Sequence, residues 1–239
     1  MSAQTMPKLN MVIVAHPDDE VLGFGGTGQF LVNRGELVQP VILCTSADKR
    51  SAHPGFEELS ADMCSANDHL GFLRPITFQF PNLELGTLAL HTIVSEIEKL
   101  LIDLAPFRIF THSTCDLNED HRIVSQATQV ALRIFQRKVG STHSGMQLLF
   151  MEILSSTEWF VDPSLRKFSP NFYIPITAEE VERKIEALGK YRGVLMDPPH
   201  PRSPESLRSL ASYRGVQSGS VYSEAFELVW SVLARSELP

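Results

Sequence analysis

No run of apolar residues in this sequence approaches the roughly 18 residues that a membrane-spanning helix needs. The first ten residues also lack the apolar core of a signal peptide. Cysteine is scarce, because only Cys44, Cys64 and Cys115 occur, and an odd number at wide spacing does not fit a disulfide framework. We therefore expect a reduced, cytoplasmic protein with no membrane partner, in which Cys44 and Cys64 are buried free thiols.

Positive charge is also in deficit. The chain has 21 Lys and Arg against 28 Asp and Glu, a net charge of −7, which argues against a nucleic-acid partner. Internal repeats, low-complexity tracts and flexible linkers are absent, and 239 residues with 43% hydrophobic content can bury a full core. We expect a single domain over residues 1–239, with a core at about 1–155 and a C-terminal elaboration at about 156–239.

Patterns typical of buried strands alternate with helical patterns along most of the chain. This alternation predicts an α/β fold built from right-handed βαβ units, with a mostly parallel sheet and helices on both faces. Thr177 and Glu180 form a capping-box pattern at a helix start, and Pro175 suits an edge strand. The expected strands are 11–14, 41–45, 76–80, 107–111, 147–154 and 171–176, the expected helices are 20–33, 57–70, 88–104, 120–138, 177–190 and 206–213, and 224–232 fits either.

The first stretch with chemical character is Met11-Val-Ile-Val-Ala-His-Pro-Asp-Asp-Glu20. Its apolar start predicts a buried strand, and one imidazole and three carboxylates follow at once. In open α/β sheets, ligands bind at the carboxyl ends of the strands. His16 and Asp19 could both reach one small cation, with Asp18 beside it, whereas Glu20 is expected to be a helix cap. We interpret this stretch as half of a metal site.

The second stretch, Thr111-His-Ser-Thr-Cys-Asp-Leu-Asn-Glu-Asp-His-Arg122, follows another expected strand. Because parallel strands end at one edge of the sheet, His121 could complete a triad with His16 and Asp19. Three nitrogen or oxygen ligands and an open water position are typical of catalytic zinc, which lowers the pKa of bound water toward ~7. Asp18 could accept the proton of that water as general base. One Zn²⁺ per chain is the expected cofactor, although Fe²⁺ or Co²⁺ fits the same ligands.

Both stretches resemble the motifs of a known family. His-Pro-Asp-Asp-Glu before Val-Leu-Gly-x-Gly-Gly, and Asp-Leu-Asn-x-Asp-His-Arg, are similar to the two metal motifs of the PIG-L/LmbE family of zinc-dependent N-acetylglucosaminyl deacetylases. The resemblance continues in Ser155-Ser-Thr-Glu-Trp159, His200-Pro-Arg-Ser203 and Tyr213-Arg-Gly. It implies a Rossmann-like fold and action on N-acetylated sugars, typically N-acetylglucosamine within a larger conjugate. It also implies His16, Asp19 and His121 as zinc ligands and Asp18 as the general base.

This chain departs from the family pattern in its second motif. Many members have a histidine where this chain has Asn118, and that histidine stabilises the tetrahedral intermediate or protonates the amine. An asparagine can donate a hydrogen bond to an oxyanion but cannot deliver a proton. We therefore expect Asn118 to stabilise the intermediate and His200 to be the acid, with His112 as the second choice. The alternative is that His200 is a solvated loop residue and His112 bonds the backbone.

The residues expected to contact the substrate also differ from the family. Many members have Thr-Asp-Gly after the second strand and arginines farther on, where this chain has Ser46-Ala47, Ser60 and Glu84. The arginines that could anchor a phosphate or carboxylate are Arg50, Arg122, Arg202 and Arg214, although any one of them could be a surface charge.

The function expected from these residues is hydrolysis of an acetyl group from an N-acetylated sugar or a sugar-containing small molecule. Zinc-bound water would attack the amide, with Asp18 as base. The alternatives are an amidase for a non-sugar amide and a zinc-retaining binding protein without turnover. A nucleotide site at Gly23-Phe-Gly-Gly26 is weaker, because the glycine spacing is incomplete and three carboxylates precede it. The oligomeric state is left open, a homo-oligomer included.

Overall fold

One seven-stranded sheet forms the centre of the computed structural model, which describes residues 7–45, 55–139 and 145–233. The strands are β1 (Leu9–Val14), β2 (Leu37–Ile42), β3 (Ile76–Thr77), β4 (Arg108–His112), β5 (Gln147–Met151), β6 (Phe172–Ile176) and β7 (Tyr222–Ser231). Their order across the sheet is β3-β2-β1-β4-β5-β7-β6. The five strands from β3 to β5 are parallel to one another, and β7 is antiparallel to both β5 and β6.

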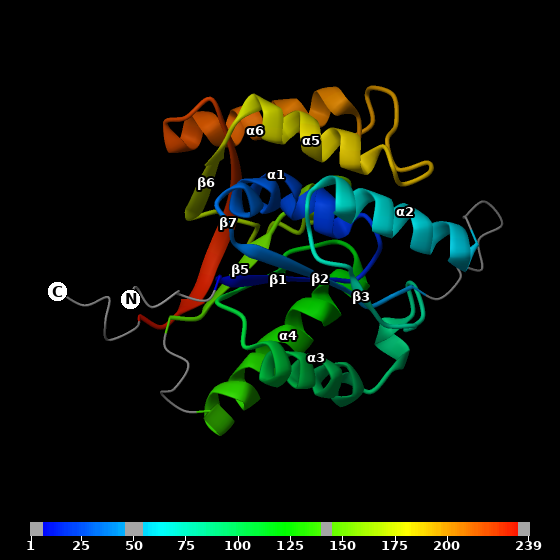
Figure 1. Ribbon diagram of the computed structural model, residues 1–239, viewed down its shortest axis with the longest axis vertical. Coiled ribbons are helices and arrows are strands. Elements are labelled where there is room, and N and C mark those ends of the chain that lie inside the picture. The colour runs from blue at the N-terminus through cyan, green and yellow to red at the C-terminus, as the bar shows by residue number, and fades with distance from the viewer. Residues whose placement is uncertain (1–6, 46–54, 140–144, 234–239) are drawn as a thin grey trace, which may run out of the picture.

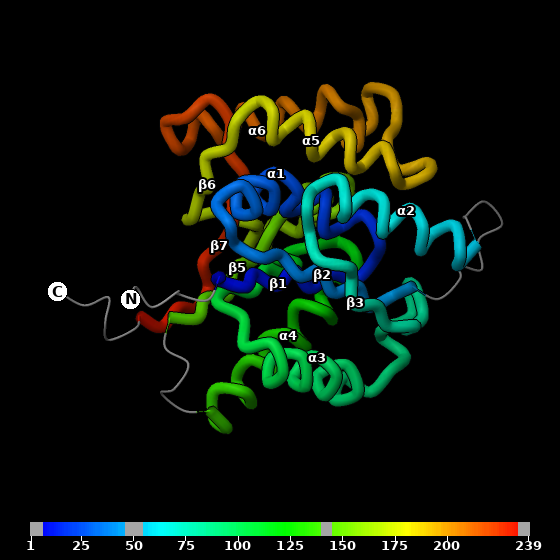
Figure 2. Tube along the Cα trace, viewed as in Figure 1, coloured from blue at the N-terminus to red at the C-terminus, as the bar shows by residue number. Residues whose placement is uncertain are grey.

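Helices cover both faces of this sheet (Figure 1). The helices are α1 (Asp19–Asn33), α2 (Phe56–His69), α3 (Leu90–Leu104), α4 (Glu119–Val139), α5 (Ala178–Leu188) and α6 (Pro204–Ser218), with short 3-10 turns η1 (Leu85–Thr87) and η3 (Thr157–Trp159). In the view of Figures 1 and 2, α1, α2, α5 and α6 lie above the sheet, and α3 and α4 lie below it. The predicted α/β class with a mostly parallel sheet is therefore confirmed.

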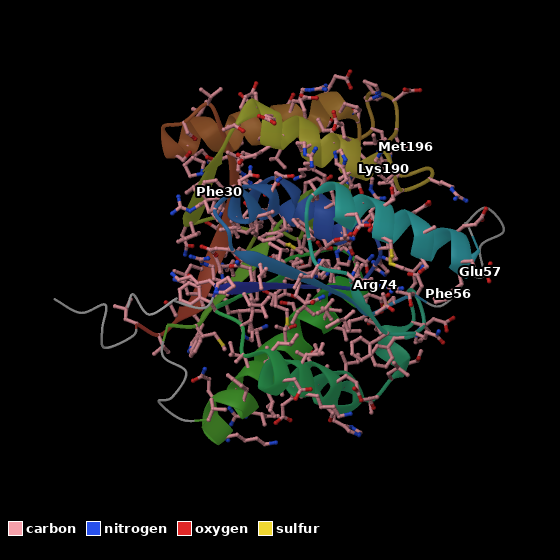
Figure 3. All side chains as sticks on the ribbon, in the orientation of Figure 1. Phe30, Phe56, Glu57, Arg74, Lys190 and Met196 are labelled. Atoms are coloured by element: carbon pink, nitrogen blue, oxygen red, sulfur yellow. The ribbon has the colours of Figure 1, made fainter. Side chains whose placement is uncertain are left out.

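The alternation of side chains along β1 explains the two helix layers. Val12 and Val14 pack in the apolar cluster that includes Phe24 of α1, whereas Met11 and Ile13 pack in the cluster with α3 and α4. All four β1 side chains are fully buried, as expected for a parallel sheet covered on both faces. Figure 3 shows side chains filling the space between the sheet and the helices on either face.

The elements from β6 to β7 belong to the same sheet and the same core as the preceding ones. β7 inserts between β5 and β6, and its Phe226 packs in one apolar cluster with Phe24 and Phe110. The predicted edge position of Pro175 is confirmed, because β6 is the last strand of the sheet. The capping box of α5 is also confirmed, since Thr177 Oγ1 accepts a hydrogen bond from the Glu180 amide and the Glu180 carboxylate accepts one from the Thr177 amide.

Several element boundaries differ from the sequence prediction. The second strand is Leu37–Ile42 rather than 41–45, the strand expected at 76–80 is only Ile76–Thr77, and the strand expected at 147–154 ends at Met151. The helix expected at 206–213 extends over Pro204–Ser218. Of the two thiols expected to be buried, Cys44 is buried and Cys64 is only partly so. None of the helices in the described ranges combines the length with the apolar character that crossing a bilayer requires.

Candidate metal centre

The two polar motifs meet because the strands that precede them are neighbours. β1 and β4 pair in parallel, and His16 and Asp19 follow β1 while His121 follows β4. The carboxyl ends of both strands lie at one edge of the sheet, where open α/β sheets bind their ligands. Asp19 and His121 lie in the first turns of α1 and α4, so two helix starts and one strand end position the three side chains.

The three side chains predicted to hold a metal form a nearly equilateral triangle. His16 Nδ1 lies 3.2 Å from His121 Nε2 and 3.3 Å from Asp19 Oδ2, and His121 Nε2 lies 3.2 Å from Asp19 Oδ2. Tetrahedral zinc with bonds of about 2.0–2.1 Å keeps its ligand atoms about 3.3 Å apart. Two imidazoles and one carboxylate at this spacing fit one zinc-sized cation and leave a fourth position for water or substrate.

A carboxylate lies beside the other ring nitrogen of each histidine. Asp120 Oδ2 is 3.0 Å from His16 Nε2, and Asp116 Oδ2 is 3.2 Å from His121 Nδ1. Such outer carboxylates fix the ring orientation and the tautomer of metal-binding histidines. The sequence analysis missed both residues, although each belongs to the second motif and lies within five positions of His121.

These contacts set the charge state of the three side chains in the metal-free protein. Burial lowers the pKa of His16, but hydrogen bonds to Asp120 and Asp19 outweigh it and raise this pKa to about 9. Burial also opposes protonation of His121, and the charge of Asp19 with that of Asp116 raises its pKa to about 10. Burial disfavours the Asp19 carboxylate, yet His121 holds the pKa of Asp19 well below its usual range.

Asp18 lies beside the triangle in an uncommon backbone conformation. It is the N-cap of α1 with φ of 101°, in the left-handed region that non-glycine residues seldom occupy. Its Oδ2 accepts a hydrogen bond of 3.1 Å from Arg202 Nη1. Burial raises the pKa of Asp18 to about 7, although Arg202 opposes this rise. A carboxyl group that titrates near neutrality can accept a proton and return it.

Glu20 does more than the helix capping expected of it. Its Oε2 accepts the backbone N–H of Asp18 at 3.1 Å, which helps to hold the N-cap conformation. Its Oε1 accepts hydrogen bonds from Asn67 of α2, at 3.0 Å, and from the Tyr191 hydroxyl. Burial raises the pKa of this fully buried carboxyl to about 7. Glu20 therefore connects α1, α2 and the segment after α5 beneath Asp18.

The triangle opens into a cleft of about 460 Å³. Asn118 lines this cleft at the start of α4, where its Oδ1 accepts the Asp120 amide at 2.9 Å. This bond leaves the Asn118 amide nitrogen as a donor for a ligand. The other described residues that line the cleft are His16, Pro17, Asp18, Asp19, Cys44, Leu59, Asp62, Asn82, Leu83, Leu117, His121, Ser155, Ser156, Tyr191, Arg192, Gly193, Val194 and Arg202.

Neither of the two histidines considered as proton donors is among the described residues that line the cleft. His112 is fully buried, its Nε2 accepts the Ala15 amide at 2.8 Å, and its ring stacks on His121 with centroids 3.9 Å apart. Burial lowers the pKa of His112 to about 3, so the ring is neutral at pH 7 and does not offer the acidic proton of an imidazolium. His200 is not among the described residues that line the cleft, and its Nδ1 accepts the backbone N–H of Arg202 at 3.0 Å.

The structure brings one of the predicted arginines to the centre. Arg202 lines the cleft and bridges Asp18 to the Ser155 hydroxyl, which accepts from Arg202 Nε at 3.0 Å. Arg122 instead donates to the carbonyls of residues 116 and 117, and Arg214 forms a two-bond pair with Glu152. Arg50 lies outside the described residues.

Comparison with known proteins matches the chain to a family of deacetylases. A family model described as PIG-L, GlcNAc-PI de-N-acetylase, matches residues 11–132, which include both motifs. The Escherichia coli K12 protein named Uncharacterized deacetylase YaiS is 27% identical over 156 residues, covering 63% of this chain and 82% of that protein.

Solved structures show that the fold is shared more widely. The N,N'-diacetylchitobiose deacetylase of Pyrococcus horikoshii has 19% identity and a TM-score of 0.72, over 93% of this chain and 84% of that one. GalB, a 4-carboxy-2-hydroxymuconate hydratase of Pseudomonas putida KT2440, has 18% identity and a TM-score of 0.72, over 97% of this chain and 100% of that one. The same fold therefore carries two reaction types, and the side chains of the site must distinguish them.

Proposed function

The chain belongs to the PIG-L family, and from this premise we propose that it is a metal-dependent N-deacetylase for an N-acetylated sugar or sugar-containing small molecule. The observation that carries the proposal is the triangle of His16, Asp19 and His121 with Asp18 beside it at the floor of the cleft. A zinc ion is the cofactor that these ligands suit best, and Fe²⁺ or Co²⁺ is compatible with them.

The reaction adds water across the amide, so that the C–N bond breaks and acetate and a free amine leave. When held by the three ligands, zinc supplies a Lewis acid for the carbonyl and lowers the pKa of water. Asp18 takes a proton from the attacking water. The Asn118 amide nitrogen donates a hydrogen bond to the oxygen on which negative charge develops.

Asp18 is also the group we assign to return the proton to the departing nitrogen. Burial raises its pKa to about 7 in the metal-free protein, and its place beside the triangle lets it accept a proton and return it. His112 is neutral and bonded to the backbone, and His200 is bonded to Arg202 rather than lining the cleft. The role of acid predicted for His200 from the sequence is therefore the less favoured one.

Arg202 is expected to orient Asp18 for both proton transfers. Replacing Arg202 by glutamine should lower kcat about 10- to 100-fold, because misplacement of a catalytic group by about 1 Å has effects of this size. Metal content should stay unchanged, since Arg202 donates its hydrogen bonds to Asp18, Ser155 and His200, none of which is a metal ligand. Arg208→Gln is the matched control, because Arg208 pairs with Glu182 at the surface. Steady-state kinetics compare the loss of kcat in Arg202→Gln, Arg208→Gln and His200→Ala. A larger loss for His200→Ala than for Arg202→Gln would restore His200 as the acid.

The proposal is tested by measuring acetate from a panel of N-acetylated sugars, nucleotide sugars and glycosylated small molecules, together with N-acetylated amino acids. We expect zinc-loaded protein to release acetate from at least one sugar-containing compound and to require Asp18. Acetate release from the N-acetylated amino acids alone would show that the protein is an amidase for non-sugar amides. Binding of a sugar compound without acetate release would show that it is a binding protein.

A further inference from the structure

The wall of the cleft carries an arginine and an aspartate that the proposed reaction does not use. Arg192, in the segment after α5, and Asp62, on α2, both line the cleft. Asp62 Oδ2 accepts the Arg192 amide at 3.2 Å, and Asp62 Oδ1 lies 3.4 Å from Arg192 Nε. The two residues are far apart in the sequence, but α2 and α5 are in contact on one side of the sheet (Figure 1). They therefore form one pair of opposite charges at the cleft.

Arg192 is held in place and still has hydrogen-bond donors to offer. Its Nη1 lies 2.6 Å from Glu58 Oε1, so the carboxylates of Glu58 and Asp62 both fix the guanidinium. The side chain is nonetheless 52% exposed. A guanidinium has five N–H donors, and in the described part of the chain Nη2 of Arg192 donates no hydrogen bond. Because the side chain is already ordered, a ligand would bind it at a small cost in conformational entropy.

Asp62 offers the complementary acceptor. Its carboxylate is buried in the wall of the cleft, and a carboxylate can accept about four hydrogen bonds, of which Arg192 supplies two contacts. The charges of Asp62 and Glu58 together exceed that of Arg192, so this place disfavours a phosphate or carboxylate. A neutral group that both donates and accepts, such as two hydroxyls on adjacent carbons, matches the pair.

The residue next to Arg192 ties this pair to the candidate metal centre. Tyr191 also lines the cleft, and its hydroxyl donates a hydrogen bond to Glu20, whose other carboxylate oxygen accepts the Asp18 amide at 3.1 Å. The pair is therefore one residue away from a bonded chain that ends at Asp18. The cleft that holds both has a volume typical of small-molecule sites.

We propose that Asp62 and Arg192 bind two neighbouring ring hydroxyls of the sugar whose acetamido group lies at the metal triangle. The inference rests on the proposed deacetylase function and assigns the residues that select the sugar. One hydroxyl donates to the Asp62 carboxylate, and the oxygen of the other accepts from Arg192 Nη2. The pair orients the ring and takes no part in bond breaking, so its loss should raise KM more than it lowers kcat.

The test removes one hydroxyl at a time from a single substrate. In a glycoside of N-acetylglucosamine, the adjacent ring hydroxyls are those on carbons 3 and 4. Methyl N-acetyl-β-glucosaminide is therefore compared with its 3-deoxy and 4-deoxy analogues on zinc-loaded protein. Wild-type kcat/KM should fall at least roughly tenfold for each analogue, because a site that hydrogen-bonds a hydroxyl strongly rejects the analogue without it.

Variants of the pair should lose this discrimination. Arg192→Gln should lower kcat/KM for the parent glycoside about tenfold, the effect of one hydrogen bond to a charged group, and Asp62→Asn should lower it several-fold. Each variant should process the analogue that lacks its own hydroxyl nearly as well as the wild type does. A merely structural role would instead lower kcat/KM by one factor for all three glycosides. Arg192→Gln keeps the backbone bond to Asp62, so thermal unfolding should show it folded.

Arg208→Gln is the matched control for the arginine. Arg208 is 43% exposed and pairs with Glu182 at 2.6 Å, but it is not among the described residues that line the cleft. Its replacement should leave kcat/KM for all three glycosides as in the wild type. Equal kcat/KM for the three glycosides in the wild type, or a loss by one factor for all three in both cleft variants, would overturn the inference and leave deacetylation intact.

Calorimetric binding of the methyl glycoside separates the inference from the proposed function. If no glycoside releases acetate, weaker binding to Arg192→Gln than to the wild type would support the sugar-binding pair although the deacetylase proposal fails. Binding that is absent, or equal in the two proteins, would overturn the inference.

Discussion

Each of the single variants His16→Ala, Asp19→Ala and His121→Ala should lose most of the bound metal, and its kcat/KM should fall by more than about 100-fold. Loss of an outer carboxylate alone costs metal sites about 10- to 100-fold, so loss of a direct ligand should cost more. The three donor atoms form a triangle with sides of 3.2–3.3 Å, and two ligands alone cannot hold the ion in a fixed position. Elemental analysis of the purified variants measures the metal, and acetate release measures the activity.

The affinity for metal should also fall as the pH is lowered. Only a neutral imidazole can bind the ion, and in the metal-free protein the pKa is about 9 for His16 and about 10 for His121. Protons therefore compete with the metal for these ring nitrogens at neutral pH. Affinity should rise as the pH increases toward 9 and fall steadily below it. Zinc titrations at several pH values measure this trend.

His69→Ala is the control for the ligand variants. His69 Nε2 lies 3.0 Å from the Glu186 carboxylate, so it is also a histidine paired with an acid, but on α2 and away from the triangle. It should keep its metal and its activity. Full metal occupancy in all three ligand variants would show that the ion is held elsewhere.

Asp18→Asn should keep the metal and lower kcat by roughly 100-fold or more. Asparagine preserves the size of the side chain and can still accept a hydrogen bond from Arg202, but it cannot accept and return a proton. The expected loss lies in kcat rather than in KM, because the change removes a group that acts during bond breaking. Steady-state kinetics and elemental analysis on one preparation separate the two effects.

Asp62→Asn is the matched change within the same cleft. Asp62 is also a buried carboxylate that lines the cleft, and it pairs with Arg192 instead of lying beside the metal triangle. Its replacement should act on KM more than on kcat. If Asp18→Asn loses zinc while Asp19→Asn keeps it, the roles of the two neighbouring carboxylates are reversed.

The sequence was sufficient to predict the class of fold, because the spacing of apolar residues along the chain shows which side chains face the core. Met11 to Val14 are buried on alternating sides of the sheet, and their unbroken apolar run shows this directly. The second strand was misplaced because Gln39 and Pro40 interrupt its apolar pattern. Both fit the strand: the Gln39 side-chain amide is satisfied by backbone carbonyls, and β3 pairs only with Val41 and Ile42, beyond Pro40.

Contacts between distant segments account for what the sequence did not reveal. The insertion of β7 between β5 and β6 depends on antiparallel pairing across long stretches of chain, which no local pattern encodes. The positions of the two motifs after their strands were enough to predict that His16 and His121 meet at adjacent strand ends. They did not show whether His200 or Arg202 reaches the site, because the loop that carries both is positioned by the contacts of Arg202 with Asp18 and Ser155.

Acetate release during the return of zinc to chelator-treated protein tests the central claim most directly. The account predicts no release from the metal-free protein, a rise in proportion to added zinc, and a break at one zinc ion per chain. Asp19→Ala should show no such rise at the same zinc concentrations. Release of acetate by the metal-free protein at the rate of the loaded one would contradict a reaction that depends on the triangle of His16, Asp19 and His121.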